Sequence, residues 1–133
     1  MSIPVVIVDN AEADRYIARR RFSRTEGFGE CMEYPSGADF VRDFRNRKSV
    51  AVNKSVPTIV LMDISMPGKN GFQAIHEYLA HAEDDPEDVV FVMYTSSNAT
   101  IDREQAAAMG AVKGYFLKPL REKDVLHIRE LAS

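Results

Sequence analysis

The feature that most constrains this chain is an apolar run that ends in a single carboxylate. Residues 59–62 read Ile-Val-Leu-Met, Asp63 follows directly, and Pro67-Gly68 breaks the pattern soon after. An uninterrupted apolar run is typical of a strand covered on both faces, as in a parallel sheet between two layers of helices. We therefore expect Asp63 at the carboxyl end of a central strand, the edge of an open α/β sheet where ligands bind. A simpler role, in which Asp63 caps the following loop or helix, stays open at this point.

Five strand patterns alternate with five helix patterns along the chain. The strands are predicted at residues 3–8, 30–34, 58–62, 89–94 and 112–117, and the helices at 11–25, from a Ser36 cap to 47, at 71–81, 100–109 and 121–132. This alternation predicts a parallel sheet with right-handed crossovers and helices on both faces. Residues 48–57 are either a loop or a helix extension, and residues 83–88 are expected to form an acidic surface loop.

Composition narrows the class of protein. A chain of 133 residues with 45% hydrophobic and 28% charged residues predicts one globular domain, and we expect residues 1–133 to contain no output module. The net charge of −3 argues against a direct nucleic-acid partner. The single cysteine, Cys31, excludes a disulfide framework and indicates a reducing compartment. No stretch resembles a membrane span or a signal peptide, so we expect a cytoplasmic protein with no membrane insertion.

Polar side chains follow four of the five predicted strands at the point where each strand ends. They are Asp9 and Asn10, Asp63, Thr95 and Ser96, and Lys118. Because the carboxyl ends of parallel strands lie on one edge of the sheet, we expect these groups to converge on one shallow cleft. Each residue has an ordinary explanation as a cap or a solvated charge, but their joint placement favours a functional site.

The chemistry that fits this set is the transfer of a phosphoryl group to a carboxylate. Aspartate is an established covalent phosphate acceptor, which makes Asp63 the candidate acceptor. An anionic donor approaches clustered carboxylates only when their charge is offset, and Mg²⁺ does this with oxygen ligands. Lys118 can pair with one phosphate oxygen, and the Thr95 hydroxyl can donate a hydrogen bond to another. The protein then contributes positioning and charge stabilisation.

With these motifs the sequence resembles a receiver domain of two-component response regulators, of the CheY-like kind, along essentially the whole chain. The matching segments are residues 6–10 with Arg15, 61–68 with Gly71, Thr95-Ser96 and 110–119. The resemblance implies a doubly wound, flavodoxin-like (βα)5 fold of the α/β class, with strand order 2-1-3-4-5. It also implies a stand-alone receiver that works in a phosphorelay.

The resemblance assigns roles by position. Asp63 would be the phosphoacceptor, Thr95 and Lys118 would contact the phosphoryl group, and Tyr115 would be the aromatic switch residue that moves with Thr95. The implied Mg²⁺ ligands are Asp9, Asn10, Asp63 and the backbone carbonyl of Ser65. The implied partners are a histidine kinase or histidine phosphotransfer protein and a downstream effector. Such a receiver is not an enzyme in the usual sense, but it catalyses its own aspartyl phosphorylation and dephosphorylation.

Asn10 departs from the family pattern, which usually has an acid at this position. An amide oxygen can ligate a metal but brings no charge, so we expect weakened Mg²⁺ binding, with Glu12 as one candidate to compensate. The departure keeps a second reading open, a degenerate receiver that binds proteins without being phosphorylated. Two further alternatives are poor. An aspartyl-nucleophile enzyme of the haloacid dehalogenase type needs an acid where Ser65 stands, and a flavin carrier needs a phosphate-binding loop where residues 9–12 are acidic.

Overall fold

A parallel sheet forms the centre of the protein. The computed structural model describes residues 2–51, 56–81 and 88–133. Within these ranges the strands are β1 (Ile3–Val8), β2 (Phe28–Tyr34), β3 (Thr58–Met62), β4 (Val89–Thr95) and β5 (Val112–Leu117). They pair in parallel in the order β2-β1-β3-β4-β5, which confirms the predicted topology.

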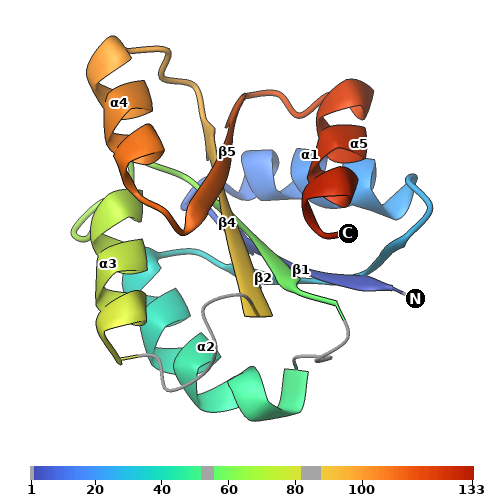
Figure 1. The fold of residues 1–133 in the computed structure, drawn as a ribbon, viewed down its shortest axis with the longest axis horizontal. Helices are drawn as coiled ribbons and strands as arrows, with labels where there is room; N and C mark the ends of the chain where they lie inside the picture. The colour runs from blue at the N-terminus through green and yellow to red at the C-terminus, as the bar shows by residue number, and fades with distance from the viewer. Residues whose placement is uncertain (1, 52–55, 82–87) are drawn as a thin grey trace.

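Helices cover both faces of this sheet. They are α1 (Glu12–Ser23), α2 (Gly37–Ala51), α3 (Gly71–His81), α4 (Thr100–Ala108) and α5 (Glu122–Leu131). Helices α1 and α5 lie on one face, and α2, α3 and α4 lie on the other (Figure 1). The arrangement confirms the doubly wound α/β class. No helix in the described part of the chain has both the length and the apolar character to cross a membrane.

Two hydrophobic cores follow from the strand periodicity. Successive side chains point to opposite faces of a strand, so the central strands contribute to both cores. Val60 and Met62 face the core under α2 and α3, while Ile59 and Leu61 face the core under α1 and α5, and all four are 0% exposed. Burial of each such side chain stabilises the fold by about 1.5–3 kcal/mol. The core therefore fixes β3, and with it the position of the residue that follows.

Several element boundaries differ from the prediction. Strand β2 begins at Phe28 instead of residue 30, because Phe28 pairs with Ile3 and its ring packs edge-on against Phe22 at 4.8 Å. Helix α2 runs on to Ala51, so residues 48–51 extend the helix, as expected where neither glycine nor proline interrupts it. The other boundaries lie within one or two residues of their predicted positions. Of the predicted acidic loop 83–88, residues 83–87 lie outside the described residues.

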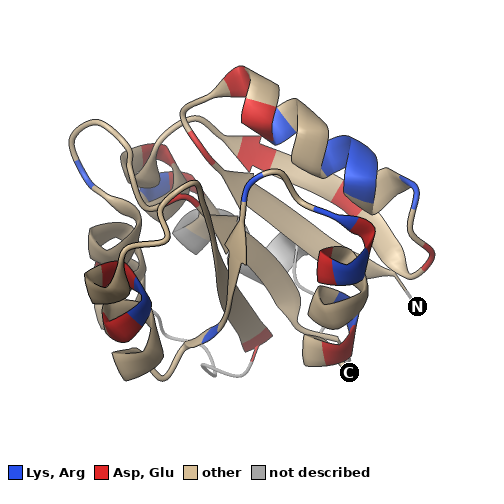
Figure 2. Cartoon of the chain, turned by 90° about the horizontal axis from the view of Figure 1, so that it is seen from above, with Lys and Arg blue, Asp and Glu red and all other residues tan. Residues whose placement is uncertain are grey.

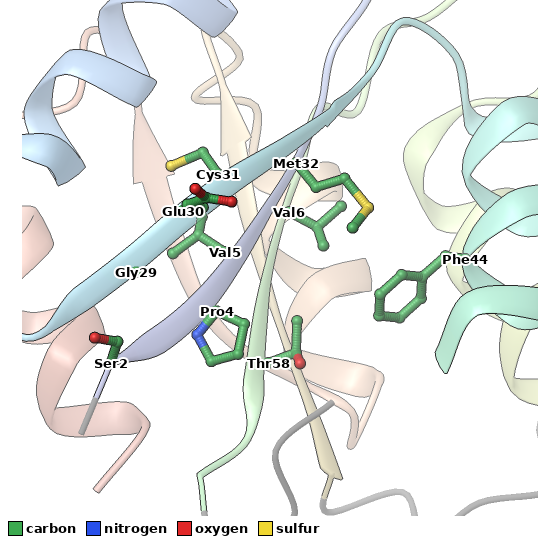
Figure 3. Close-up of a pocket in the computed structure, with 10 residues that line it drawn as sticks. All are labelled: Ser2, Pro4, Val5, Val6, Gly29, Glu30, Cys31, Met32, Phe44 and Thr58. Carbon is green, nitrogen blue, oxygen red and sulfur yellow. The ribbon is translucent and has the colours of Figure 1, made fainter. Parts of the chain in front are cut away.

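A cavity of about 460 Å³ lies at the amino end of the sheet, on the edge opposite to Asp63. Pro4, Val6, Met32, Phe44 and Thr58 contribute side chains to its wall (Figure 3). Thr58 is 1% exposed, and its hydroxyl makes no hydrogen bond with any described residue. A buried hydroxyl without a partner destabilises the folded state.

Replacing this hydroxyl with a methyl group should stabilise the protein. We expect Thr58→Val to raise the free energy of unfolding by about 1 kcal/mol, since an unpaired buried hydroxyl costs roughly 1–3 kcal/mol. The matched control is Thr25→Val, because the Thr25 hydroxyl donates a hydrogen bond to the Arg21 carbonyl at 2.9 Å. Urea unfolding should show a gain for the first variant and a small loss for the control. Equal losses in both variants would contradict the assignment.

Candidate functional site

Asp63 is held at the end of β3 by its backbone. Its N–H donates a hydrogen bond to the Val8 carbonyl at 2.9 Å, which joins it to the end of β1. The chain then returns so closely that a Cβ at Gly71 would lie 2.1 Å from the Asp63 carbonyl oxygen. Only glycine allows α3 to begin at this distance. The Asp63 residue is 4% exposed, so the carboxylate sits at a nearly closed edge of the sheet.

Asp9 lies beside Asp63 at the end of β1 and is 0% exposed. Its Oδ1 accepts a hydrogen bond from the Ala11 N–H at 2.9 Å, which orients the carboxylate at the start of α1. Arg15 holds the backbone of this residue, because its Nη1 donates to the Asp9 carbonyl at 2.6 Å and its Nε pairs with Glu33 at 3.1 Å. The second carboxylate oxygen, Oδ2, is fully buried.

Lys118 brings the carboxylates together. Its backbone N–H donates to the Thr95 carbonyl at 2.9 Å, so the residue is fixed where β5 ends beside β4. Its ammonium Nζ lies 2.7 Å from Asp9 Oδ2, 2.9 Å from Asp14 Oδ2 and 3.6 Å from Asp63 Oδ2. Three carboxylates therefore share one ammonium, and only part of their mutual repulsion is offset.

The pKa values reflect this crowding. The pKa of Asp63 is raised to about 6, first by burial and then by the charge of Asp9, while Lys118 and the Ser65 backbone N–H act in the opposite direction. Burial disfavours the charge on Lys118, but the close approach of Asp9 and Asp14 outweighs it and raises the pKa of the ammonium. Ionised Asp63 is thus held in a place that favours its neutral form.

The acidic site fits a hard divalent cation. Asp9 Oδ2 is fully buried, and its one close polar neighbour in the described contacts is the Lys118 ammonium at 2.7 Å. A carboxylate oxygen can accept more than one such contact, so Asp9 Oδ2 keeps capacity for a further cation. Mg²⁺ prefers one or two carboxylates together with water and phosphate oxygens. Among the described residues no group of three acidic, histidine or cysteine side chains is arranged to hold a metal ion. A cation at Asp9 and Asp63 would therefore need water or phosphate oxygens as further ligands.

A chain of hydrogen bonds leads from Thr95 to the surface. The buried Thr95 hydroxyl oxygen accepts from the Ser97 N–H at 3.1 Å, and the Ser97 carbonyl accepts from the Tyr115 hydroxyl at 2.7 Å. The Arg103 guanidinium lies 4.6 Å from the centre of the Tyr115 ring. Thr95 acts here as an acceptor, so its own hydroxyl hydrogen remains available to another oxygen.

The structure does not bring all the predicted residues together. Asp9, Asp63 and Lys118 converge, and Ser65 contributes a backbone N–H to Asp63 while its side chain is exposed. The Asn10 side chain is exposed and forms no hydrogen bond with the described residues.

Glu12, one candidate to supply the missing charge, does not do so in this structure. Its side chain is exposed at the start of α1 and contacts neither Lys118 nor the carboxylates. Figure 2 shows acidic residues at the start of this helix and basic residues along the rest of it.

Two residues that contact this network were not predicted as part of it. Asp14 pairs with Lys118, although its place in a first helical turn is fully explained by the helix dipole. The negative charge that is missing at Asn10 was the one signal in the sequence for a further acid nearby, and it suggested Glu12 instead of Asp14. Ser97 is the second such residue, and its bonds to Thr95 and Tyr115 run through its own backbone N–H and carbonyl, which leave no mark on the sequence.

Comparison with known proteins gives the family. The model of the response regulator receiver domain matches residues 5–129. The chain is 31% identical over 123 residues to Protein PilH of Pseudomonas aeruginosa, across 92% of this chain and 90% of PilH. The chain therefore belongs to the response regulator receiver domain family, whose members serve two-component signalling.

Solved structures agree on the fold. A two-component response regulator from Cytophaga hutchinsonii superimposes with a TM-score of 0.88 at 21% identity, over 98% of this chain and 97% of the other. CheY in the CheX–CheY–BeF3–Mg²⁺ complex from Borrelia burgdorferi gives a TM-score of 0.76 at 21% identity, over 97% of this chain and 87% of the other. These likenesses confirm the CheY-like, flavodoxin-like architecture.

The raised pKa of Asp63 predicts a pH-dependent gain in stability when its charge is removed. The pKa of this carboxyl is about 6 in the folded state, compared with an ordinary value of 3.8. Its contribution to the free energy of unfolding is therefore fully present below pH 4 and is lost as the pH rises through 6. In chelator at pH 7.5, Asp63→Asn should therefore raise the free energy of unfolding by about 1–3 kcal/mol. The gain should shrink toward pH 4, where wild-type Asp63 is protonated.

Urea unfolding at several pH values measures this difference. The control is Asp39→Asn, which removes an exposed carboxylate paired with Arg42 and should give no gain at neutral pH. A wild-type protein as stable as Asp63→Asn at pH 7.5 would show that burial and the charge of Asp9 do not disfavour ionised Asp63.

Proposed function

We propose that the chain is a phosphoacceptor receiver of a two-component phosphorelay, in which Asp63 accepts a phosphoryl group from a histidine kinase or a histidine phosphotransfer protein. The observation that carries the proposal is the convergence of Asp63, Asp9 and Lys118 at the carboxyl edge of the sheet, with Nζ 2.7 Å from Asp9 and 3.6 Å from Asp63. Membership of the receiver family supports it.

The chemical step is an in-line displacement at phosphorus. A carboxylate oxygen of Asp63 forms a bond to the phosphorus of a phosphohistidine, and the phosphorus–nitrogen bond breaks. Its electron pair returns to the imidazole of the donor, and an aspartyl phosphate remains on the chain. In a separate hydrolysis step, the oxygen of water forms a bond to phosphorus and the bond between phosphorus and the Asp63 oxygen breaks, so that Asp63 leaves as a carboxylate and inorganic phosphate is released. The chain thus catalyses its own phosphorylation and dephosphorylation, and we propose it as a signalling receiver and not as an enzyme.

Lys118 and Thr95 stabilise the transferred group. Lys118 exchanges its carboxylate partners for a phosphoryl oxygen, because a compact ammonium pairs readily with such an oxygen. The Thr95 hydroxyl donates its remaining hydrogen to a second oxygen. Asp9 and Asp63 would hold Mg²⁺ with the Ser65 carbonyl, and the ion would neutralise charge that develops on the phosphoryl oxygens. Asn10 would contribute at most an uncharged oxygen.

The signal leaves the site through Thr95 and Tyr115. When Thr95 turns toward a phosphoryl group, its contact with Ser97 changes, and the Ser97 carbonyl holds the Tyr115 hydroxyl at 2.7 Å. The face that includes Tyr115 then differs between the two states and is read by a downstream effector protein. We further propose that residues 1–133 form one receiver domain and that it works in the cytoplasm.

A degenerate receiver is the second candidate. The exposed Asn10, which does not contact the carboxylates, favours a chain that binds proteins without phosphorylation. In that function the Tyr115 face would serve as a constant binding surface.

Phosphorylation of the intact protein separates the two candidates. After incubation with acetyl phosphate and Mg²⁺, we expect the wild-type mass to increase by one phosphoryl group. Asp63→Asn should show no increase, because the acceptor oxygen is absent, and chelator should abolish the increase in the wild type. Asp39→Asn, which changes a carboxylate of α2, should be phosphorylated like the wild type. No mass increase at any Mg²⁺ concentration would leave the degenerate receiver as the better account.

A further inference from the structure

Asp14 is the third carboxylate of the site and is not at the end of a strand. It lies in the first turn of α1, and its Oδ2 is 2.9 Å from Lys118 Nζ, closer than Asp63 Oδ2 at 3.6 Å. The Lys118 side chain is 13% exposed and that of Asp14 is 33% exposed. A contact with this little access to water is screened less than a surface ion pair.

Asp14 also restores the charge that Asn10 lacks. The three carboxylates of Asp9, Asp14 and Asp63 and the one ammonium of Lys118 carry a net charge of −2 when ionised, and −1 without Asp14. Only the net charge of −2, with Asp14 included, neutralises a divalent cation. The neutral Asn10 is exposed and contributes nothing to this sum.

The position of Asp14 matters as well as its charge. Lys118 contacts the two carboxylates that would bind a metal, and it competes with the metal for their oxygens. Asp14 offers the ammonium a partner outside that pair, on the α1 side of the cleft. Glu12 stands in the same helical turn, yet it is exposed and touches neither group, so general acidity of the turn does not explain the contact.

We propose that Asp14 is a positioning residue of the phosphoacceptor site: it keeps a partner for the Lys118 ammonium on α1 when a divalent cation takes the place of this ammonium at Asp9 and Asp63, and it supplies the negative charge that Asn10 does not. This inference rests on the proposed function of the site. It assigns Asp14 no contact with the phosphoryl group.

The test is Mg²⁺ affinity, measured by calorimetry on the full chain without a phosphodonor. Asp14→Asn should weaken Mg²⁺ binding about fivefold or more, because the net charge falls and Lys118 turns back to the metal carboxylates. Asp14→Glu keeps a carboxylate and should stay within about threefold of the wild type. Glu12→Gln, the matched control in the same turn, should bind like the wild type.

A relocated charge provides the rescue. In the double variant Asn10→Asp/Asp14→Asn, the carboxylate stands on the strand-end loop, and Mg²⁺ affinity should return at least to the wild-type value. Urea unfolding of each variant checks that the fold is retained. Wild-type affinity in Asp14→Asn, or a loss that Asn10→Asp does not recover, would overturn the proposal while the receiver function stands. Absence of Mg²⁺ binding by the wild type would overturn both.

Discussion

The ion pairs of one ammonium hold the functional edge of this molecule together. Lys118 Nζ lies within 2.7 to 3.6 Å of carboxylates from the ends of β1 and β3 and from α1, while its own backbone is bonded to β4. Removing this ammonium would leave three carboxylates without a compensating charge, which is strongly unfavourable. The geometry of the edge is therefore a joint property of four elements.

The two cores make this crowded edge possible. Residues 59–62 are completely buried between two layers of helices, so β3 cannot shift to relieve the repulsion between Asp9 and Asp63. The cost appears instead as the raised pKa of Asp63. Active sites commonly carry such unfavourable electrostatics, which the rest of the fold offsets. The buried hydroxyl of Thr58, at the other end of the same strand, is a second small cost without a comparable purpose in the described contacts.

Most of the fold followed from the sequence because breakers and apolar runs coincide. The element at residues 58–62 was predicted to the residue, since Pro57 precedes it and Asp63 ends it. The edge strand β2 was predicted too short, because its first residues pack locally and lack the continuous apolar pattern of a central strand. The convergence of Asp9, Asp63 and Lys118 followed from parallel topology alone. Asp14 did not, because a helix places its side chain by rotation about an axis whose orientation only the tertiary structure defines. The catalytic and metal roles of these residues stay predictions.

The link between Thr95 and Tyr115 passes through one peptide unit. Ser97 gives its N–H to Thr95 and its carbonyl to Tyr115, while its hydroxyl is occupied by Asp102 of α4 at 2.6 Å. The main chain of Ser97 therefore joins Thr95 to Tyr115, while its side chain binds α4. A substitution at residue 97 can therefore alter how firmly α4 is anchored without removing the backbone bonds that join Thr95 to Tyr115. Sequence changes at this position can thus accumulate while the hydrogen bonds of its backbone to Thr95 and Tyr115 are retained.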